Sequence, residues 1–234
     1  MFQPVDAAVL IERCQGLKGE LQLQRRGREF EIIYNGLFIM ATYNGASEKA
    51  AVREALQETA TCFTAPLKVL IGGLGVGYSL REALDCPAVA GVTVIELEPA
   101  VIKWNQEVLA EVNGSALDDS RTMVINDDFR KVLQKKGRHH SGTLSGLFHV
   151  VMVDTDNGSS WLSLPENAEI YSEDGLSLIL KCLYPGGAAC FWAARREEEF
   201  EERLKKYFYR VEFRTVPEKT GHDGCYYIAV KALK

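Results

Sequence analysis

Hydrophobic and polar positions alternate with a period of two in the N-terminal part of the chain. The alternation covers residues 20–25 and 30–34, and the apolar run 37–41 follows them as a third strand. Asn35-Gly36 between the last two runs is a strong signal for a tight hairpin, because both residues tolerate a positive φ. The pattern therefore predicts an antiparallel β-meander within residues 1–46. A sheet this small needs a neighbour to pack against.

From Ser47 onward the apolar spacing becomes helical, and Ser47 is predicted to cap a helix over residues 48–61. Strand-like and helix-like segments then alternate. Short apolar runs predict strands near residues 68–71, 92–96, 121–125, 148–153 and 187–192. Amphipathic runs predict helices near residues 78–85, 99–111, 127–135, 173–183 and 195–206. Such alternation is typical of a parallel sheet with helices on both faces. The runs 208–215 and 225–230 would close this sheet as an antiparallel pair, giving one Rossmann-like domain over residues 47–234.

Composition and charge narrow the classes of function. The 234 residues include 27 Lys and Arg against 32 Asp and Glu, and the net charge of −5 disfavours a nucleic-acid partner, which usually meets a basic stripe. No apolar stretch reaches the ~18 residues of a membrane span. Residues 1–16 carry an acid within their apolar run and lack the basic start of a signal peptide. We therefore expect a cytoplasmic protein with no membrane partner.

The spacing of the cysteines and histidines argues against a bound metal. The six cysteines stand far apart without a Cys-x-x-Cys pair, and the four histidines are scattered, with His139-His140 in a polar loop. Most of the cysteines are expected to be reduced residues of the core.

A glycine-rich turn follows the strand predicted at 68–71 and leads directly into the next helix. Its glycines Gly73, Gly75 and Gly77 would let a ligand approach the main chain at the helix N-terminus. Glu96 ends the next strand 23 residues beyond Gly73, close to the spacing of a carboxylate that binds ribose. We expect a nucleoside here, although glycines that serve only helix–strand packing would give the same pattern.

Carboxylates also follow the third predicted strand. Asp127 and Asp128 would lie beside the adenine of such a nucleoside, where a carboxylate can accept a hydrogen bond from the exocyclic amine. Asp128 could instead cap the next helix, and Glu98 could be a favourable charge at a helix N-terminus. One glycine-rich turn and contacts for a single nucleoside favour S-adenosylmethionine chemistry over a nicotinamide cofactor.

Asp154 and Asp156 follow the fourth predicted strand, at the edge where open α/β sheets bind ligands. Two carboxylates there could deprotonate an amine substrate or hold a cationic one. Asp156-Asn-Gly is also good turn chemistry by itself. Trp161 and Tyr171 could close over the acceptor as an apolar lid, or they could be ordinary packing residues.

Together these motifs resemble the spermidine synthase family, aminopropyltransferases built on the class I methyltransferase fold. The resemblance covers residues 20–215 and rests on Leu80-Arg81-Glu82, Val94-Ile-Glu-Leu-Glu, Ile125-Asn-Asp-Asp, Val153-Asp-Thr-Asp, Asp156-Asn-Gly158, Pro165-Glu-Asn167, Tyr171-Ser172 and Tyr184-Pro-Gly-Gly187. It implies a class I methyltransferase-like α/β sandwich, a seven-stranded sheet with an antiparallel edge, preceded by a small β-meander. By resemblance, Glu96 would hold the ribose hydroxyls, Asp127 the adenine amine, and Asp154 would be the catalytic aspartate.

Three departures from the family pattern bear on the substrate. Val76 stands where the family has an acid that holds the amino group of the aminopropyl donor. A Tyr-His pair expected near residues 44–48 is absent, and the acidic motif at Asp154 and Asp156 is short and lacks its proline. Without an acid at position 76, we expect little preference between S-adenosylmethionine and its decarboxylated form.

The sequence thus predicts a transferase that uses S-adenosylmethionine or decarboxylated S-adenosylmethionine as donor and a small amine as acceptor. The resemblance further implies a homodimer formed through the N-terminal strands. Two alternatives stay open, which are a methyltransferase of another small molecule and a nucleoside-binding protein without catalysis.

Overall fold

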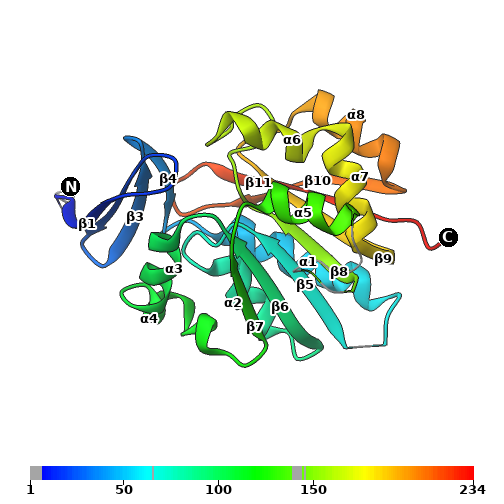
Figure 1. Cartoon of the computed structure of the whole chain (residues 1–234), viewed down its shortest axis with the longest axis horizontal. Helices are drawn as coiled ribbons and strands as arrows, with labels where there is room; N and C mark the ends of the chain where they lie inside the picture. Colours follow the sequence, from blue (N-terminus) through cyan, green and yellow to red (C-terminus); the bar gives the residue numbers. More distant parts are fainter. Residues whose placement is uncertain (1–6, 65, 139–143, 145) are drawn as a thin grey trace.

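The structure, a computed structural model, describes residues 7–64, 66–138, 144 and 146–234. It contains two sheets, of four and seven strands. Figure 1 shows the four-stranded sheet at one end of the molecule and the larger sheet running between two layers of helices. The α/β sandwich with an antiparallel edge and an N-terminal antiparallel sheet, as predicted from the sequence, is confirmed. His139 and His140 lie outside the described residues.

The N-terminal sheet is an antiparallel meander of four strands in sequential order. Its strands are β1 (Val9–Gln15), β2 (Glu20–Arg26), β3 (Glu29–Tyr34) and β4 (Leu37–Ala41). The β3–β4 turn is the predicted hairpin, since Asn35 and Gly36 both have positive φ, 48° and 76°. The sequence pattern predicted only the last three strands. It missed β1 because three apolar residues in succession, Val9 to Ile11, break the alternation, and all three are exposed.

The large sheet has the strand order β10-β11-β9-β8-β5-β6-β7. The parallel strands are β5 (Leu67–Gly72), β6 (Val89–Glu96), β7 (Thr122–Asn126), β8 (Phe148–Val153) and β9 (Leu183–Ala193). β11 (Asp223–Val230) and β10 (Arg210–Pro217) continue it as the antiparallel edge. The chain leaves β5 toward β6 on one side and returns later to β8 on the other. This reversal at β5 is where open α/β sheets bind ligands, outside the carboxyl ends of the strands.

Helices cover both faces of the large sheet (Figure 1). One layer contains α1 (Ala46–Ala60), α2 (Tyr78–Asp85), α3 (Pro99–Gln106), α4 (Ala110–Asn113) and the short η1 (Ala116–Asp118). The other contains α5 (Phe129–Arg138), η2 (Pro165–Asn167), α6 (Ala168–Tyr171), α7 (Glu173–Cys182) and α8 (Glu198–Tyr207). Strand side chains alternate between the layers. Val69 and Ile71 belong to the core under α1, whereas Leu70 belongs to the core under α5 and α7.

Several helix boundaries differ from the sequence prediction, and the differences at α1 and α3 change a predicted cap and a predicted element. Ser47 does not cap α1, because the helix begins at Ala46, two residues earlier than predicted, with Gly45 as its N-cap. The first three backbone N–H groups there donate to the carboxylate of Glu218, from the β10–β11 turn. A single helix over residues 99–111 is also wrong, since α3 ends at Gln106 and α4 is a separate short helix.

All six cysteines are free, and Cys182, Cys190 and Cys225 are buried in the core. Among the described residues, no helix is long and apolar enough to cross a membrane.

Candidate functional site

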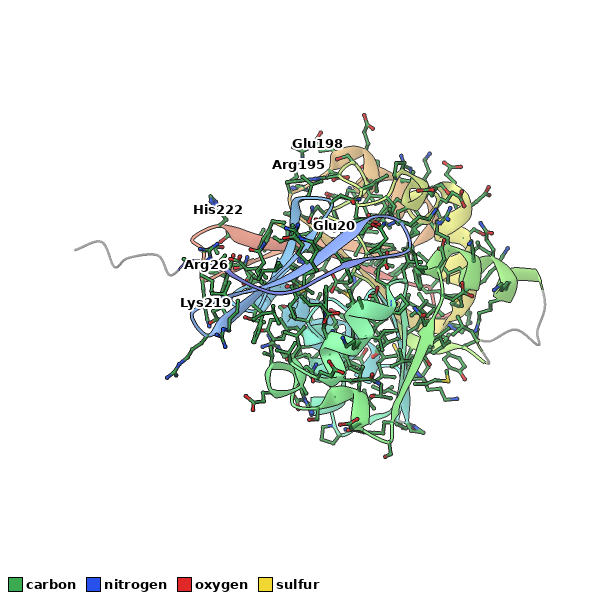
Figure 2. The ribbon with its side chains drawn as sticks, turned by 60° about the vertical axis from the view of Figure 1, so that its left-hand side comes forward. Glu20, Arg26, Arg195, Glu198, Lys219 and His222 are labelled. Atoms are coloured by element: carbon green, nitrogen blue, oxygen red, sulfur yellow. The ribbon has the colours of Figure 1, made fainter. Side chains whose placement is uncertain are left out.

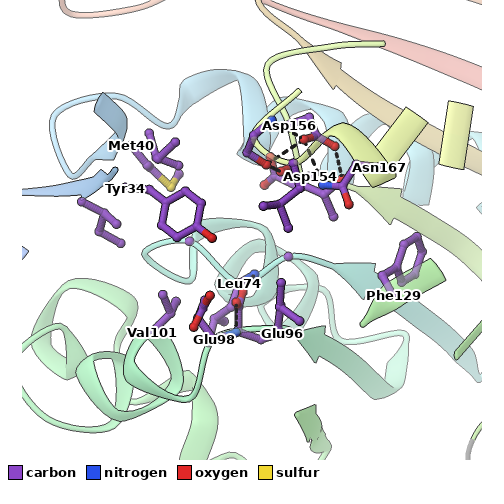
Figure 3. A pocket seen from close by; sticks show the side chains of 18 of the residues that line it. Tyr34, Met40, Leu74, Glu96, Glu98, Val101, Phe129, Asp154, Asp156 and Asn167 are labelled. Carbon is purple, nitrogen blue, oxygen red and sulfur yellow. Dashed lines mark hydrogen bonds between the residues drawn. The ribbon is translucent and has the colours of Figure 1, made fainter. Parts of the chain in front are cut away.

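A pocket of about 180 Å³ opens at the carboxyl ends of β5, β6 and β8 (Figure 3). Its floor is formed by the loops that follow these three strands, and the loop and short helices after β8 form a further side. The opposite wall comes from the N-terminal sheet, through Leu21, Ile32, Tyr34, Ile39 and Met40. Figure 2, turned so that this side of the molecule comes forward, shows the N-terminal sheet lying across the front. The N-terminal sheet therefore packs against the domain that contains the large sheet, and in this position it closes the pocket.

The glycine-rich turn after β5 forms part of the pocket floor. Gly73 and Gly75 both line the pocket and both have positive φ, 91° and 54°. A Cβ at Gly73 would overlap the carbonyl oxygen of Asp154, and one at Gly75 would lie 2.5 Å from the sulfur of Met40. The first glycine thus brings β5 close to β8, and the second brings the turn close to the N-terminal sheet.

Gly77 is not among the residues that line the pocket. It precedes α2 with a φ of 86°, and a Cβ there would lie 2.8 Å from the Cβ of Asn113 and 2.9 Å from Oδ1 of Asn105. Its positive φ and its close packing against these two buried side chains explain why residue 77 is a glycine. No contact with a ligand is needed to explain it.

Glu96 ends β6 and lines the pocket, as its place in the sequence predicted. Its Oε2 accepts the backbone N–H of Leu74 at 2.8 Å, and its Oε1 accepts that of Glu98 at 2.8 Å. These two bonds fix the carboxylate, and each oxygen retains a lone-pair site for a further donor. Burial raises the pKa of Glu96, with a smaller contribution from the neighbouring Glu98 carboxylate.

Glu98 also lines the pocket, and it joins the two sheets. Its carboxylate accepts the backbone N–H of Leu17, from the β1–β2 turn, at 2.8 and 3.1 Å. Gly16 beside it has no room for a side chain, because a Cβ would lie 2.6 Å from a Glu98 oxygen. The helix-terminus role considered for Glu98 is therefore accompanied by a second one, holding the N-terminal sheet over the pocket.

Of the two carboxylates after β7, only Asp128 lines the pocket. It forms an ion pair with Arg130 at 2.7 Å and accepts the backbone N–H of Arg130, at the start of α5. Asp127 instead forms an ion pair with Lys135 at 2.9 Å. A hydrogen bond from Lys135 lowers the pKa of Asp127. The structure thus directs Asp127, expected at the adenine, toward α5.

Asp154 lies at the end of β8, half-buried against the pocket. The Ser79 hydroxyl donates to it at 3.1 Å. Burial raises the pKa of Asp154 to about 8, with a contribution from the carboxyl of Glu48 and a smaller one from Glu96. The like charges that contribute to this raised pKa belong to Glu48 and Glu96, and Asp156 is not among them.

Glu48 is a pocket residue that the sequence analysis missed. It is buried in the first turn of α1, and its carboxyl accepts the Ser47 hydroxyl at 2.6 Å. Burial raises the pKa of Glu48. In the sequence, an acid in a first helical turn is ordinary, because it complements the helix dipole. Only its burial beside Asp154 distinguishes it.

The carboxylate of Asp156 is buried and fully occupied by donors of this chain. It accepts the Ser163 backbone N–H and hydroxyl at 2.7 Å each, and also accepts Asn167 Nδ2, the Thr155 hydroxyl and the Tyr171 hydroxyl at 3.0, 2.8 and 3.2 Å. Asp156 therefore organises the segment from residue 155 to residue 171, which forms one side of the pocket. This arrangement favours the turn interpretation of Asp156.

The two candidate lid residues do not lie over the pocket. Trp161 is exposed, and Tyr171 is buried with its ring against Phe200. Val76 is fully buried and also lies outside the lining. The residue at that position therefore does not decide the charge of the pocket.

The charge of the pocket is one-sided. Of the lining residues within the described part of the chain, none is Lys, Arg or His, whereas six carry a carboxyl group. These six are Glu48, Glu96, Glu98, Asp128, Asp154 and Asp156. A cationic ligand complements such a pocket, and an anionic group on the ligand would find no cationic partner there.

Comparison with known proteins identifies a family. Residues 49–228 match the family model described as the spermine/spermidine synthase domain. A polyamine aminopropyltransferase of Mycobacterium tuberculosis is 28% identical over 168 residues, which is 72% of this chain and 29% of that protein. The chain thus spans less than a third of the length of this relative.

Solved structures share the fold. The spermidine synthase of Thermotoga maritima superposes with a TM-score of 0.74 over 96% of this chain and 73% of its own, at 16% sequence identity. A spermidine synthase in complex with the transition-state analogue AdoDATO superposes with the same score, coverage and identity.

Proposed function

Because this chain belongs to the spermine/spermidine synthase domain family, we propose that it transfers an aminopropyl group from decarboxylated S-adenosylmethionine to a small amine. The single observation that carries this proposal is the pocket with six carboxyl groups and, among its described lining residues, no cationic side chain. Both substrates of such a transfer are cations at neutral pH, since the donor is a sulfonium with a primary amine and the acceptor is a protonated amine. The AdoDATO complex of a spermidine synthase with this fold is consistent with the assignment.

The charge of the pocket also supports the choice of donor. S-adenosylmethionine differs from its decarboxylated form by one carboxylate. At an effective dielectric constant of about 20, a carboxylate held roughly 6 Å from another costs about 3 kcal/mol when no cation intervenes. The decarboxylated donor avoids this repulsion. We therefore replace the expectation of little preference, which rested on Val76, by a preference for the decarboxylated donor.

In this proposal Asp154 is the general base. The nitrogen of the acceptor forms a bond to the aminopropyl carbon attached to sulfur, the carbon–sulfur bond breaks, and its electron pair returns to sulfur. Methylthioadenosine leaves as a neutral thioether, so no acid is needed for the leaving group. The acceptor must lose a proton to attack, and Asp154 accepts it. The raised pKa of about 8 belongs to the pocket without a ligand, and the positive charge of a bound sulfonium favours the ionised form of Asp154. Once ionised, Asp154 is a stronger base than an ordinary carboxylate.

Glu48 is assigned a supporting role at the acceptor. Its buried carboxyl lies in the first turn of α1, close enough to Asp154 to raise the pKa of that residue. Placed with Asp154 around one part of the pocket, it would hold the acceptor by charge and align its nitrogen with the donor carbon. Asp156 is assigned a structural role, in which its hydrogen bonds order the segment from residue 155 to residue 171.

The nucleoside part of the donor is assigned to the other side of the pocket. Glu96 would accept hydrogen bonds from the ribose hydroxyls through its remaining lone pairs. Gly73 and Gly75 leave the turn without side chains, and Asp128 lines the pocket near Phe129, where the adenine is expected.

We also propose a homodimer through the N-terminal sheet. Leu37 and Phe38 on β4 and Val9 and Leu10 on β1 are large apolar side chains that remain exposed in one chain. An apolar surface shared between copies would cover them. Light scattering tests this, and a monomer at micromolar concentration would contradict it.

Turnover tests the proposed function. Incubation with decarboxylated S-adenosylmethionine and a diamine such as putrescine should release methylthioadenosine and an aminopropylated amine. Asp154→Asn should keep the affinity for methylthioadenosine within about 1 kcal/mol and lower turnover by 10²–10⁴, the usual loss for a general base. Asp119→Asn, in an ion pair with Arg121 outside the pocket, is the control and should keep full turnover. A methylated amine as product would establish the methyltransferase alternative, and binding without any product would establish the non-catalytic one.

A further inference from the structure

The hydroxyl of Tyr34 is a buried polar group that the packing of the fold does not require. Tyr34 is the last residue of β3, lines the pocket and is 8% exposed. Its hydroxyl oxygen has no hydrogen-bond partner within the described part of the chain. In Figure 3 the ring lies between Met40 and the pair Glu96 and Glu98, with the hydroxyl directed into the pocket.

We propose that the Tyr34 hydroxyl donates a hydrogen bond to a ribose hydroxyl oxygen of the bound nucleoside, so that the N-terminal sheet selects the ligand as well as covering it. This inference rests on the proposed function, because it requires the nucleoside to lie at Glu96.

The energetic argument starts from burial. A buried polar group without a partner costs free energy, and such groups are uncommon in folded proteins. A phenylalanine at position 34 would fill the same space among Leu21, Ile32 and Met40 without that cost. The hydroxyl is therefore explained only by a partner that enters the pocket.

The chemistry of the ribose site indicates which partner. A ribose hydroxyl that donates to Glu96 still presents its own oxygen lone pairs, which need a donor. Of the other side-chain hydroxyl, amide and indole donors in the lining, all but the partly exposed Asn157 have a hydrogen-bond partner within the described part of the chain. Ser163 and Asn167 donate to Asp156, Thr155 does the same, and the Trp192 indole donates to Ser47. Tyr34 is the lining donor whose hydroxyl is buried and unengaged among the described residues.

The protonation state of Tyr34 is suited to donation. Burial raises its pKa to about 12, with contributions from the carboxylates of Glu98 and Glu166. The phenol therefore keeps its proton at any pH at which the protein would act, and it meets a ligand oxygen as a neutral donor. Because Glu96 and Glu98 can only accept when ionised, donor and acceptors on the two sides of the ribose are complementary.

Tyr34→Phe tests the proposal, with Tyr43→Phe as the matched control. Tyr43 is a half-buried tyrosine in the loop after β4 whose hydroxyl donates to Glu31 at 3.2 Å, and it does not line the pocket. Calorimetry with methylthioadenosine should show affinity about 3- to 10-fold lower for Tyr34→Phe, as for the loss of one neutral hydrogen bond. Tyr43→Phe should bind as the wild type does. The urea midpoint of Tyr34→Phe should be unchanged or higher, since no recorded bond is lost.

Deoxy analogues identify the contacted group. The 2′-deoxy and 3′-deoxy forms of methylthioadenosine should each bind the wild type more weakly. For the form that lacks the contacted hydroxyl, Tyr34→Phe should cause no further loss. Equal affinity of wild type and Tyr34→Phe for methylthioadenosine, or the same loss with both deoxy forms as with the parent compound, would overturn the proposal while leaving the proposed function intact. Failure of the wild type to bind any of the three would overturn both.

Discussion

At the scale of single residues, Asp154 and Asp156 show how two carboxylates of one motif come to have different roles. Asp156 accepts hydrogen bonds from four residues, and these bonds occupy its carboxylate oxygens. Asp154 accepts one hydroxyl, faces the pocket and lies near Glu48 and Glu96. An under-satisfied, half-buried carboxyl with a raised pKa is suited to accept a proton, whereas a saturated one is suited to order a loop.

The raised pKa of Asp154 predicts how its replacement changes stability with pH. Between about pH 4 and pH 8 the folded protein holds a proton at Asp154 that the unfolded chain has lost. The free energy of unfolding therefore falls as the pH rises through this window. Asp154→Asn removes this contribution, so relative to the wild type it should gain at least about 1 kcal/mol in unfolding free energy between pH 5 and pH 9.

Urea unfolding at the two pH values measures this difference, and the titrations of Glu48 and Glu96 largely cancel because both proteins contain them. Asp127→Asn is the control for this stability measurement. Its pKa is lowered by Lys135 at the surface, so it should show no such gain. A stability difference between wild type and Asp154→Asn that does not change with pH would contradict the raised pKa.

Glu96 predicts the second residue-scale result. Glu96→Gln keeps the shape of the side chain and exchanges a charged acceptor for a neutral one, so affinity for methylthioadenosine should fall by about 1–3 kcal/mol. Because the amide can satisfy only one of the two backbone N–H groups now held by Glu96, circular dichroism must accompany the calorimetry. A folded Glu96→Gln protein with wild-type affinity would show that the ribose binds elsewhere.

At the scale of elements, the segment after β8 depends on one side chain. Asp156→Asn places an amide among donors from Ser163, Asn167, Thr155 and Tyr171, and one of its two positions cannot accept. We expect a loss of about 1–3 kcal/mol in unfolding free energy, the range for a buried donor left unpaired. Denaturant unfolding measures it. Wild-type stability combined with loss of turnover would instead indicate that Asp156 takes part in the reaction.

The elements themselves were largely predictable from the sequence, because their periodicity reflects burial on one face or both. β8, at residues 148–153, was predicted to the residue, as all six of its side chains are buried. β1 was not predicted because its apolar residues are consecutive in the sequence and exposed, so they show no alternation. The end of α3 was not predicted because residues 100–111 contain no proline or glycine to mark it.

The site was less predictable, since it combines residues far apart in the sequence. Gly73, Glu96 and Asp154 follow strand ends, and strand ends meet at one edge of a parallel sheet, so a local pattern placed them. Glu48 and Tyr34 enter the pocket from a helix and from the other sheet. Nothing in their neighbours along the chain distinguishes them from a helix-terminal acid and a strand aromatic.

At the scale of the whole molecule, the two sheets and the helix α1 enclose a space whose charge is set by parts of the chain from Glu48 to Asp156. No single motif produces this charge, and Val76, which does not line the pocket, does not contribute to it. The proposed ligand of this pocket is a sulfonium cation that carries an amine and no carboxylate.

Calorimetry with the two donors tests this central claim most directly. Decarboxylated S-adenosylmethionine should bind at least about a hundredfold more tightly than S-adenosylmethionine, which corresponds to about 2.7 kcal/mol at 1.36 kcal/mol per decade. Methylthioadenosine, which has neither the charge nor the carboxylate, should bind with intermediate affinity. Equal affinity for the two donors, or tighter binding of S-adenosylmethionine, would contradict the account.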